Sequence, residues 1–378
     1  HFRVIGQSFP YNSWATGTSE VSSGSGLIVR THILNGHKRT VLSVDTTGTT
    51  VISGSKDRTA KVWDLEKGVE KCSFHHHPNS VSCVRFIPNS HMALTVSLSF
   101  IRIWDLRSEQ CVRTLHSSGL ADSHSIFRKQ KCFVCKYMQS LNALILIGFY
   151  RLMFTTFNND VRIWNLEKFA TFGRLSGATQ SSKSEISCLG FLDGVRPRIF
   201  TGSRDHRLKM YEINIDGLGL FEAAHEFSSA HHECITSLLP YGDVLFSASK
   251  NLIMRFSLQD MKRDHIELQA HNKWIQSMRI LEADKPLLVT ACKEARIKLW
   301  DITSTRKLRL LYEIDHAHDG AINEIATYSS MLFTVFNYFY DSELFRSIEK
   351  QKFRCFYVAA FHKFSFEFAN FFYKLASE

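Results

Sequence analysis

The chain has 378 residues, of which 44% are hydrophobic and 22% are charged, with a formal net charge of +10. These values suit a soluble protein with a core, and the longest uncharged apolar stretch, Tyr137 to Tyr150, is shorter than the ~20 residues that span a bilayer. The 9 cysteines are scattered and odd in number, which indicates reduced thiols of a cytosolic protein and not a disulfide framework. About half of the positive excess lies in two atypical segments, 119–151 and 336–378, so nucleic acid is an unlikely partner.

The first 25 residues are rich in Ser and Gly and predict a flexible linker. Because no signal peptide is visible and the first residue is His1, we expect a fragment of a longer chain. The apolar run "GLIVRTHI" (26–33) follows, and its place predicts a strand that closes a ring against the last repeat. The short runs 40–45, 50–55, 60–65 and "VEKCSF" then alternate with period two between turn-forming residues, which predicts four antiparallel strands.

A looser copy of this first unit recurs five times. The aromatic residue that closes the third strand stands at intervals of 41, 60, 47, 45 and 44 residues: Trp63, Trp104, Trp164, Tyr211, Phe256 and Trp300. A period of about 40–45 residues with four strands per unit is typical of propeller blades. Radial stacking buries both faces of each small sheet and protects its edges. The sequence therefore predicts one all-β propeller over residues 26–335.

Two segments depart from this pattern. Residues 119–151 stand where the first strand of the third unit is expected and explain the long interval. A seventh unit begins at Ala317–Val335 but lacks its charged turn and Trp strand, and a Phe-dense tail, 336–378, follows. Both segments are interpreted either as real insertions or as mistranslated non-coding sequence, and we favour the second interpretation.

Catalytic and metal-binding motifs are missing from the sequence. It contains neither phosphate-binding glycine motif, no H-E-x-x-H and no nucleophile elbow. Cys132 and Cys135 form a lone C-x-x-C in the atypical insert, and the adjacent histidines His75 to His77 rarely converge on one metal, so His77 is better assigned to the core of its repeat. We therefore expect no metal, no cofactor, no small-molecule substrate and no enzymatic activity.

The pairs Gly36-His37 and Trp63-Asp64 resemble the signature of WD repeats. This resemblance implies a propeller that is commonly seven-bladed, here with six complete units and a degraded seventh. It also implies a buried hydrogen-bond relay in the first unit through His37, Asp57, Trp63 and either Ser53 or Ser55. In other units the turn Asp is replaced by Ser99, Asn159, Asn251 or Glu294, and Trp by Tyr211 or Phe256.

The residue before the turn Asp is basic in four of the six units. In WD-repeat propellers this turn lies on the top face, around the central channel. Ordinary solvated turn residues are one interpretation, and a positive rim that accepts an acidic segment is the other. Trp274 is either an exposed contact residue or the start of a strand. The candidate partner-binding residues are Lys56, Arg58, Arg204, Lys250, Lys293, Lys273 and Trp274, with Lys38 and Arg39 in a neighbouring loop.

The segments "LNGHKRTVLSVD", "SGSKDRTAKVWDLEKG" and "CVRTLHSSG", together with a second unit that lacks its turn Asp, resemble the C-terminal WD-repeat domain of kinesin-4 class kinesin-like motor proteins. The resemblance covers about Thr31 to Val335 and implies a cytoplasmic, cytoskeleton-associated interaction platform that binds tubulin, cargo or regulatory proteins. Any motor ATPase would lie outside these residues. The alternative function is a substrate receptor of a ubiquitin ligase that recognises an acidic or phosphorylated peptide.

Overall fold

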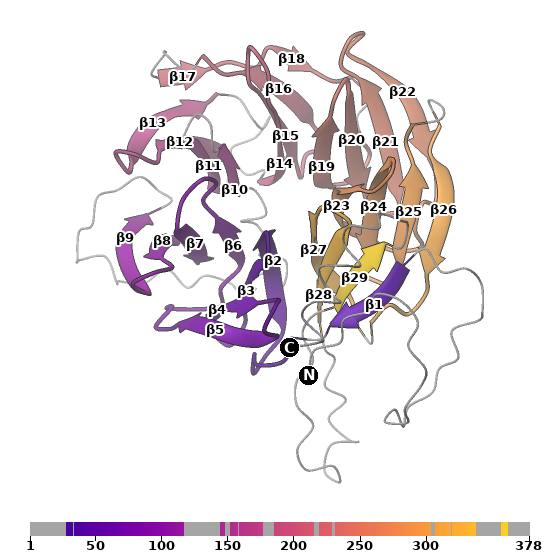
Figure 1. Cartoon of the computed structure of the whole chain (residues 1–378). Coiled ribbons are helices and arrows are strands. Elements are labelled where there is room, and N and C mark those ends of the chain that lie inside the picture. Colours follow the sequence, from indigo (N-terminus) through magenta and orange to yellow (C-terminus); the bar gives the residue numbers. More distant parts are fainter. Residues whose placement is uncertain are drawn as a thin grey trace, which may run out of the picture.

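The computed structural model describes residues 28–32, 34–116, 144–147, 152–157, 159–176, 185–214, 219–228, 231–303, 307–318, 320–337 and 357–361. Every regular element in these ranges is a β-strand, and the strands form seven separate sheets. Figure 1 shows the sheets arranged as a ring, with β1 and β29, the first and last of the described strands, side by side. We call each sheet a blade and number the blades along the chain.

The first three blades have these strands. Blade 1 contains β2 (Val41–Thr47), β3 (Thr50–Ser55), β4 (Ala60–Asp64) and β5 (Val69–Phe74). Blade 2 contains β6 (Cys83–Phe86), β7 (Met92–Ser97), β8 (Phe100–Asp105) and β9 (Gln110–His116). Blade 3 contains β10 (Leu144–Ile147), β11 (Leu152–Phe157), β12 (Asp160–Asn165), β13 (Ala170–Leu175) and a fifth strand, β17 (Gly219–Phe221).

The next three blades follow the same order. Blade 4 contains β14 (Ile186–Leu192), β15 (Arg198–Ser203), β16 (Leu208–Glu212) and β18 (His225–Glu226). Blade 5 contains β19 (Ile235–Tyr241), β20 (Val244–Ser249), β21 (Leu252–Ser257) and β22 (Lys262–Glu267). Blade 6 contains β23 (Ile275–Glu282), β24 (Pro286–Cys292), β25 (Ile297–Asp301) and β26 (Arg309–Ile314).

The seventh sheet brings the two ends of the propeller together. It contains β27 (Ile322–Tyr328), β28 (Met331–Phe336), β29 (Tyr357–Phe361) and, at its outer edge, β1 (Ile28–His32). β1 pairs antiparallel with β29, with Ile28 opposite Phe361, as the chain-closing role of this segment requires. The prediction of an all-β propeller with six complete units is confirmed.

The two atypical segments also contribute strands to the ring. β10 comes from 119–151 and pairs with β11, and β29 comes from 336–378 and pairs with β28. The predicted linker, residues 1–25, and Cys132 and Cys135 lie outside the described residues. The domain boundaries stay predictions.

The core is divided among the seven junctions between neighbouring blades. Each junction has its own cluster of buried hydrophobic residues, including one between blade 7 and blade 1 that joins Phe333 and Val335 to Val41 and Trp63. Second strands such as β3 are buried on both faces, whereas the outer strand β9 and the first half of β5 are exposed. Burial against two neighbours explains why these second strands are near-continuous runs of apolar and small residues and do not alternate apolar with charged ones.

A charged network joins the inner strands of blades 1, 2, 6 and 7. Glu324 Oε1 accepts hydrogen bonds from Arg85 Nη2 at 2.6 Å and Arg279 Nη2 at 3.2 Å, and its Oε2 accepts one from Val44 N at 3.1 Å. Burial alone would raise the pKa of Glu324, but the two guanidinium groups lower it. The network therefore holds the ionised carboxylate of Glu324 among blades 6 and 7 at the end of the ring and blades 1 and 2 at its start.

The connection between β16 and β18 leaves its own blade. Its middle part, β17, pairs in parallel with β13 of blade 3, with Gly173 opposite Gly219. A Cβ on Gly173 would lie 2.4 Å from the Gly219 carbonyl oxygen, so this approach requires glycine. Ser176 N also donates to Phe221 O at 2.8 Å. Blades 3 and 4 are thus joined by backbone hydrogen bonds as well as by side-chain packing.

Candidate functional site

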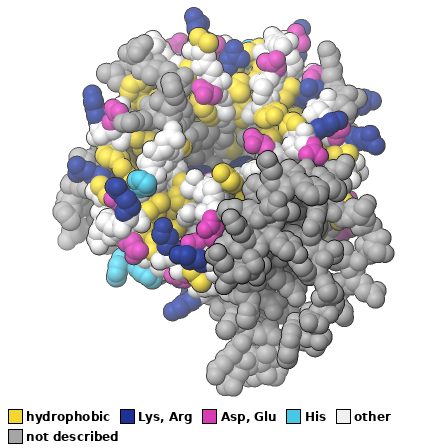
Figure 2. All heavy atoms as spheres, in the orientation of Figure 1, with side chains coloured by type: hydrophobic (Ala, Val, Ile, Leu, Met, Phe, Trp, Pro, Cys, Tyr) yellow, Lys and Arg dark blue, Asp and Glu magenta, His cyan; other side chains and the backbone are white. Residues whose placement is uncertain are grey.

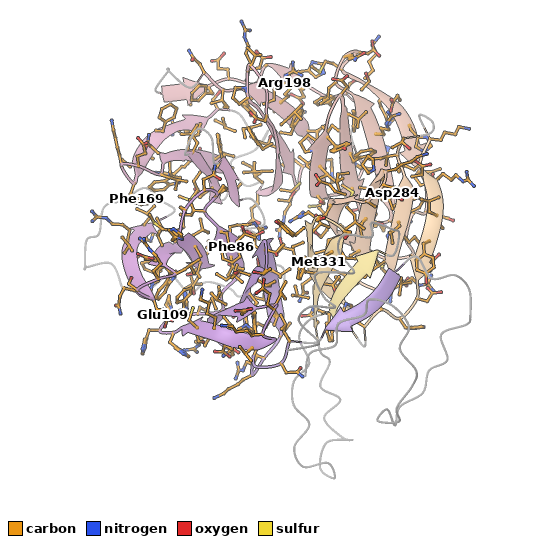
Figure 3. The ribbon with its side chains drawn as sticks, viewed as in Figure 1. Phe86, Glu109, Phe169, Arg198, Asp284 and Met331 are labelled. Carbon is orange, nitrogen blue, oxygen red and sulfur yellow. The ribbon has the colours of Figure 1, made fainter. Side chains whose placement is uncertain are left out.

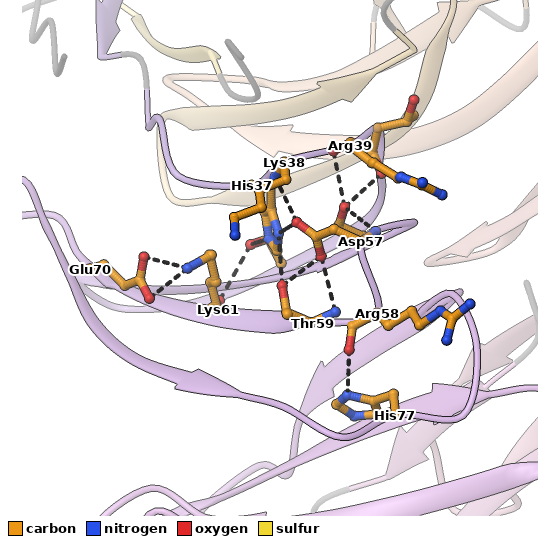
Figure 4. Close-up of polar contacts among 12 residues, drawn as sticks. His37, Lys38, Arg39, Asp57, Arg58, Thr59, Lys61, Glu70 and His77 are labelled. Atoms are coloured by element: carbon orange, nitrogen blue, oxygen red, sulfur yellow. Dashed lines mark hydrogen bonds and ion pairs between the residues drawn. The ribbon is translucent and has the colours of Figure 1, made fainter. Parts of the chain in front are cut away.

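The relay of blade 1 includes Asp57 of the turn between β3 and β4, which Figure 4 shows beside His37. Trp63 Nε1 donates to Ser53 Oγ at 2.8 Å, and Ser53 Oγ lies 2.8 Å from His37 Nε2. On the other side of the imidazole, His37 Nδ1 lies 2.9 Å from Asp57 Oδ2. Burial lowers the pKa of His37 and favours its neutral form. In that form Ser53 donates to Nε2, and Nδ1–H donates to Asp57.

The structure separates the two serines that the sequence left as alternatives. Ser53 is the relay residue, whereas Ser55 Oγ donates to the carbonyl oxygens of Arg39 and Thr40 at 3.0 and 2.9 Å. Asp57 also accepts hydrogen bonds from Thr59 Oγ1 at 2.6 Å and Lys38 N at 2.7 Å. Burial would raise the pKa of Asp57, but the hydrogen bonds from His37 and its other donors lower it overall. The turn and the preceding loop are therefore fixed around one buried carboxylate.

The other blades keep parts of this relay. His77, His231, His271 and His318 each lie within hydrogen-bond distance of a second-strand hydroxyl, and Trp104, Trp164 and Trp300 each donate to one. His77 Nδ1 is 3.1 Å from the carbonyl oxygen of Arg58 in blade 1, so one relay contacts the turn of its neighbour. His75 and His76, by contrast, are exposed.

The interpretation of the missing turn Asp as a substitution holds for Glu294 but was wrong for Ser99, Asn159 and Asn251. In blades 1, 4 and 6 four residues separate the second and third strands, and the turn keeps an acidic residue: Asp57, Asp205 and Glu294. In blades 2, 3 and 5 only two residues separate these strands. Ser99, Asn159 and Asn251 therefore lie in shorter turns that have no position equivalent to Asp57.

The predicted basic rim is divided into two parts with different electrostatics. In blades 4 to 6 its cations have carboxylate partners: Arg204 with Glu185 at 3.1 Å, Lys250 with Glu233 at 3.2 Å and Lys273 with Glu294 at 3.8 Å. The Lys293 ammonium lies 5.7 Å from the ring centroid of Trp274, which is half-buried. These pairs weaken the positive field on that side of the rim.

Blade 1 carries the other part. Lys38, Arg39, Lys56 and Arg58 are all exposed, and no ion pair of their side chains occurs among the described residues. Their one acidic neighbour in the turn, Asp57, is engaged by the relay. Arg58 has a φ of 67°, which fixes the turn in a left-handed conformation. We call these four residues the blade 1 basic cluster.

Sequence reasoning missed the acidic partners and the charged network of the inner strands. Glu185 and Glu233 stand one or two residues before a first strand, so they share the top face with the turn cations. Arg85, Arg279 and Glu324 interrupt apolar first strands, and a charge at such a position is the signal that would have indicated the network.

Comparison with known proteins places this geometry in a family. Residues 28–64, 68–105 and 263–301 match the family model "WD domain, G-beta repeat". The chain is 41% identical over 319 residues to Kinesin-like protein klp-12 of Caenorhabditis elegans, covering 82% of this chain and 20% of that protein. It is 32% identical over 310 residues to Kinesin-like protein KIF21A of Homo sapiens, and 30% over 306 residues to KIF21B, covering 80% and 79% of this chain and 18% of each relative.

The fold, the relay and the matched repeats define a WD-repeat β-propeller, a class whose role is protein interaction. The chain is a WD-repeat domain of a kinesin-like protein, as its resemblance indicated. It spans about a fifth of the length of these relatives. No helix in the described part of the chain has the length and apolar composition needed to cross a bilayer.

Proposed function

We propose that this propeller is a non-enzymatic interaction platform that binds an acidic protein segment at the blade 1 basic cluster. The observation that carries the proposal is the set of four exposed cations held over a buried relay, without carboxylate partners among the described residues. Several cations on one rigid loop pair add their fields and steer an acidic partner. Because the turn is already fixed, little conformational entropy is lost when the partner binds.

As a domain of a kinesin-like protein, the propeller would meet microtubules in the cytoplasm, and tubulin tails are the acidic segments that we propose it binds. The paired cations Arg204, Lys250 and Lys273, with Lys293 and Trp274, would form a secondary part of the same surface. Their carboxylate partners must be displaced or accommodated, so each should contribute less than a residue of the blade 1 basic cluster.

Microtubule co-sedimentation of two matched variants tests the proposal. The first combines Lys38→Glu, Arg39→Glu, Lys56→Glu and Arg58→Glu. The second reverses four exposed lysines outside the top-face turns, with the same change in net charge: Lys67→Glu, Lys168→Glu, Lys262→Glu and Lys285→Glu.

The first variant should lose most binding and most of its salt dependence, because screening acts over about 8–10 Å at physiological ionic strength. The second should bind nearly as well as the parent. Equal loss of binding by both variants would indicate diffuse charge attraction. Unchanged binding by the first variant would show that the blade 1 basic cluster is not the binding site.

A further inference from the structure

A cavity of about 400 Å³ lies among the innermost strands, in the centre of the ring. The rim is formed by turns between second and third strands, whereas this cavity is lined along the first strands, from Leu42 and Asn323 near their starts to Phe191 and Pro240 near their ends. Figure 3 places Phe86 near the centre of the ring and Glu109 and Phe169 at its periphery, and Figure 2 shows the centre hollowed.

Among the charged side chains that line the cavity, the groups with unused hydrogen-bonding capacity are donors. Glu324 already accepts three hydrogen bonds, and Asp45 Oδ2 accepts one from Phe86 N at 2.8 Å. Arg279 has five N–H donors, and its hydrogen bonds to described residues are Nη1 to Met278 O at 2.9 Å and Nη2 to Glu324. Its side chain is 31% exposed. A carboxylate is the group best suited to the remaining donors.

The wall contributed by blades 4 and 5 is mainly apolar, although Thr236 and Ser237 also line it. Leu189, Phe191, Leu239 and Pro240 line it, and a Cβ on Gly190 would lie 2.8 Å from Pro240 Cδ, so the two inner strands are tightly packed there. A ligand of this cavity therefore meets a charged wall on one side and an apolar wall on the other. This matches an acidic residue next to an apolar residue in a peptide.

A second cavity, of about 700 Å³, continues outward between blades 1 and 2. It shares Asp45, Phe86 and Pro88 with the first, and Lys71, His91 and Arg107 line its outer part. The lining of the two cavities together includes four Lys and Arg residues against two carboxylates, Asp45 and Glu324, and one of the four, Arg107, also pairs with Asp105 at 3.4 Å. The continuous shape fits an extended segment, and the excess of basic residues fits an acidic one.

We infer that the track formed by these two cavities binds an extended acidic peptide segment of a protein partner. One carboxylate of the segment pairs with Arg279, the neighbouring apolar side chain packs on Phe191 and Pro240, and a further carboxylate lies near Lys71. No residue of the blade 1 basic cluster lines this track, so the propeller would hold two acidic segments at two different places.

The test uses the full chain carrying the four Glu substitutions of the blade 1 basic cluster, so that failure of the proposed function does not affect it. The probe is a fluorescein-labelled peptide of alternating Glu and Leu, measured by fluorescence anisotropy. We expect saturable binding at one site per chain. Arg279→Gln and Lys71→Gln should each weaken it, the former by about tenfold because its charge is partly desolvated.

The matched control is Lys285→Gln, an exposed lysine on the β23–β24 turn that lines neither cavity. It should leave the affinity within about twofold of its background. Lys71 is exposed, so Lys71→Gln decides the matter if Arg279→Gln melts early. The inference would be overturned if the peptide did not bind or if Lys285→Gln weakened binding as much as the cavity variants. It would also be overturned if a peptide of alternating Gln and Leu bound with equal affinity.

Discussion

Replacing Trp63 with Ala should lower the free energy of unfolding by about 5 kcal/mol. Trp63 is 2% exposed and packs between blades 1 and 7, where truncation of a buried Trp to Ala typically costs about 3–5 kcal/mol. The same change removes the donor to Ser53 Oγ, which adds about 1 kcal/mol. A loss of this size is comparable with the whole stability of many domains, so the variant should be largely unfolded or protease-sensitive.

Two further variants separate packing from the relay. Trp63→Phe keeps most of the apolar volume but removes the indole N–H, so it should cost about 1–3 kcal/mol. Ser53→Ala removes the acceptor, and the double variant should show a coupling energy of about 0.5–3 kcal/mol because the two groups are 2.8 Å apart. Urea unfolding followed by far-UV circular dichroism gives these values. A midpoint for Trp63→Ala equal to that of the parent would refute the reasoning.

Three other changes test the ring. Between pH 7 and 5 the propeller should lose stability, because burial lowers the pKa of three relay histidines. The pKa falls to about 4 for His77 in blade 2 and to about 3 for His231 in blade 5 and His271 in blade 6. The unfolded state takes up protons at a higher pH than the folded state, which lowers the free energy of unfolding by about 2 kcal/mol per histidine at pH 5. His231→Gln should therefore reduce the dependence of the urea midpoint on pH. An unchanged slope would contradict this. Glu324→Gln should cost about 3 kcal/mol in urea unfolding by leaving two partly buried guanidinium groups short of a carboxylate, and a loss below about 1 kcal/mol would show the network to be dispensable. Gly173→Ala should speed amide hydrogen exchange in Gly219–Phe221, whereas unchanged exchange would mean that β17 tolerates a Cβ there.

Strand positions and the relay could be predicted because both are local in sequence. The period-two runs of blade 1 match β2 to β5 within one or two residues, and the spacing of His37, Asp57 and Trp63 is set by one hairpin and the loop before it. Turn length could not be predicted from composition, since Asn251 in a two-residue turn resembles a substituted Asp in a four-residue turn.

The repeat pattern could not predict the contacts between blades. The pairing of Arg204 with Glu185 depends on how two loops meet in space, and the junction of β1 with β29 joins segments more than 300 residues apart. β17 is three residues long and pairs in parallel, so it leaves no periodic signal in the sequence.

The β13–β17 pairing changes how mechanical load and thermal opening would spread through the ring. In most repeat arrays each unit contacts its neighbours through side chains alone, so units can loosen one at a time. Here Tyr211, which takes the place of Trp in blade 4, donates to the carbonyl oxygen of Ser176 beside the same pairing. The amide hydrogens of the two blades would therefore exchange together, as one cooperative unit. Local opening of the ring would begin at another junction between blades.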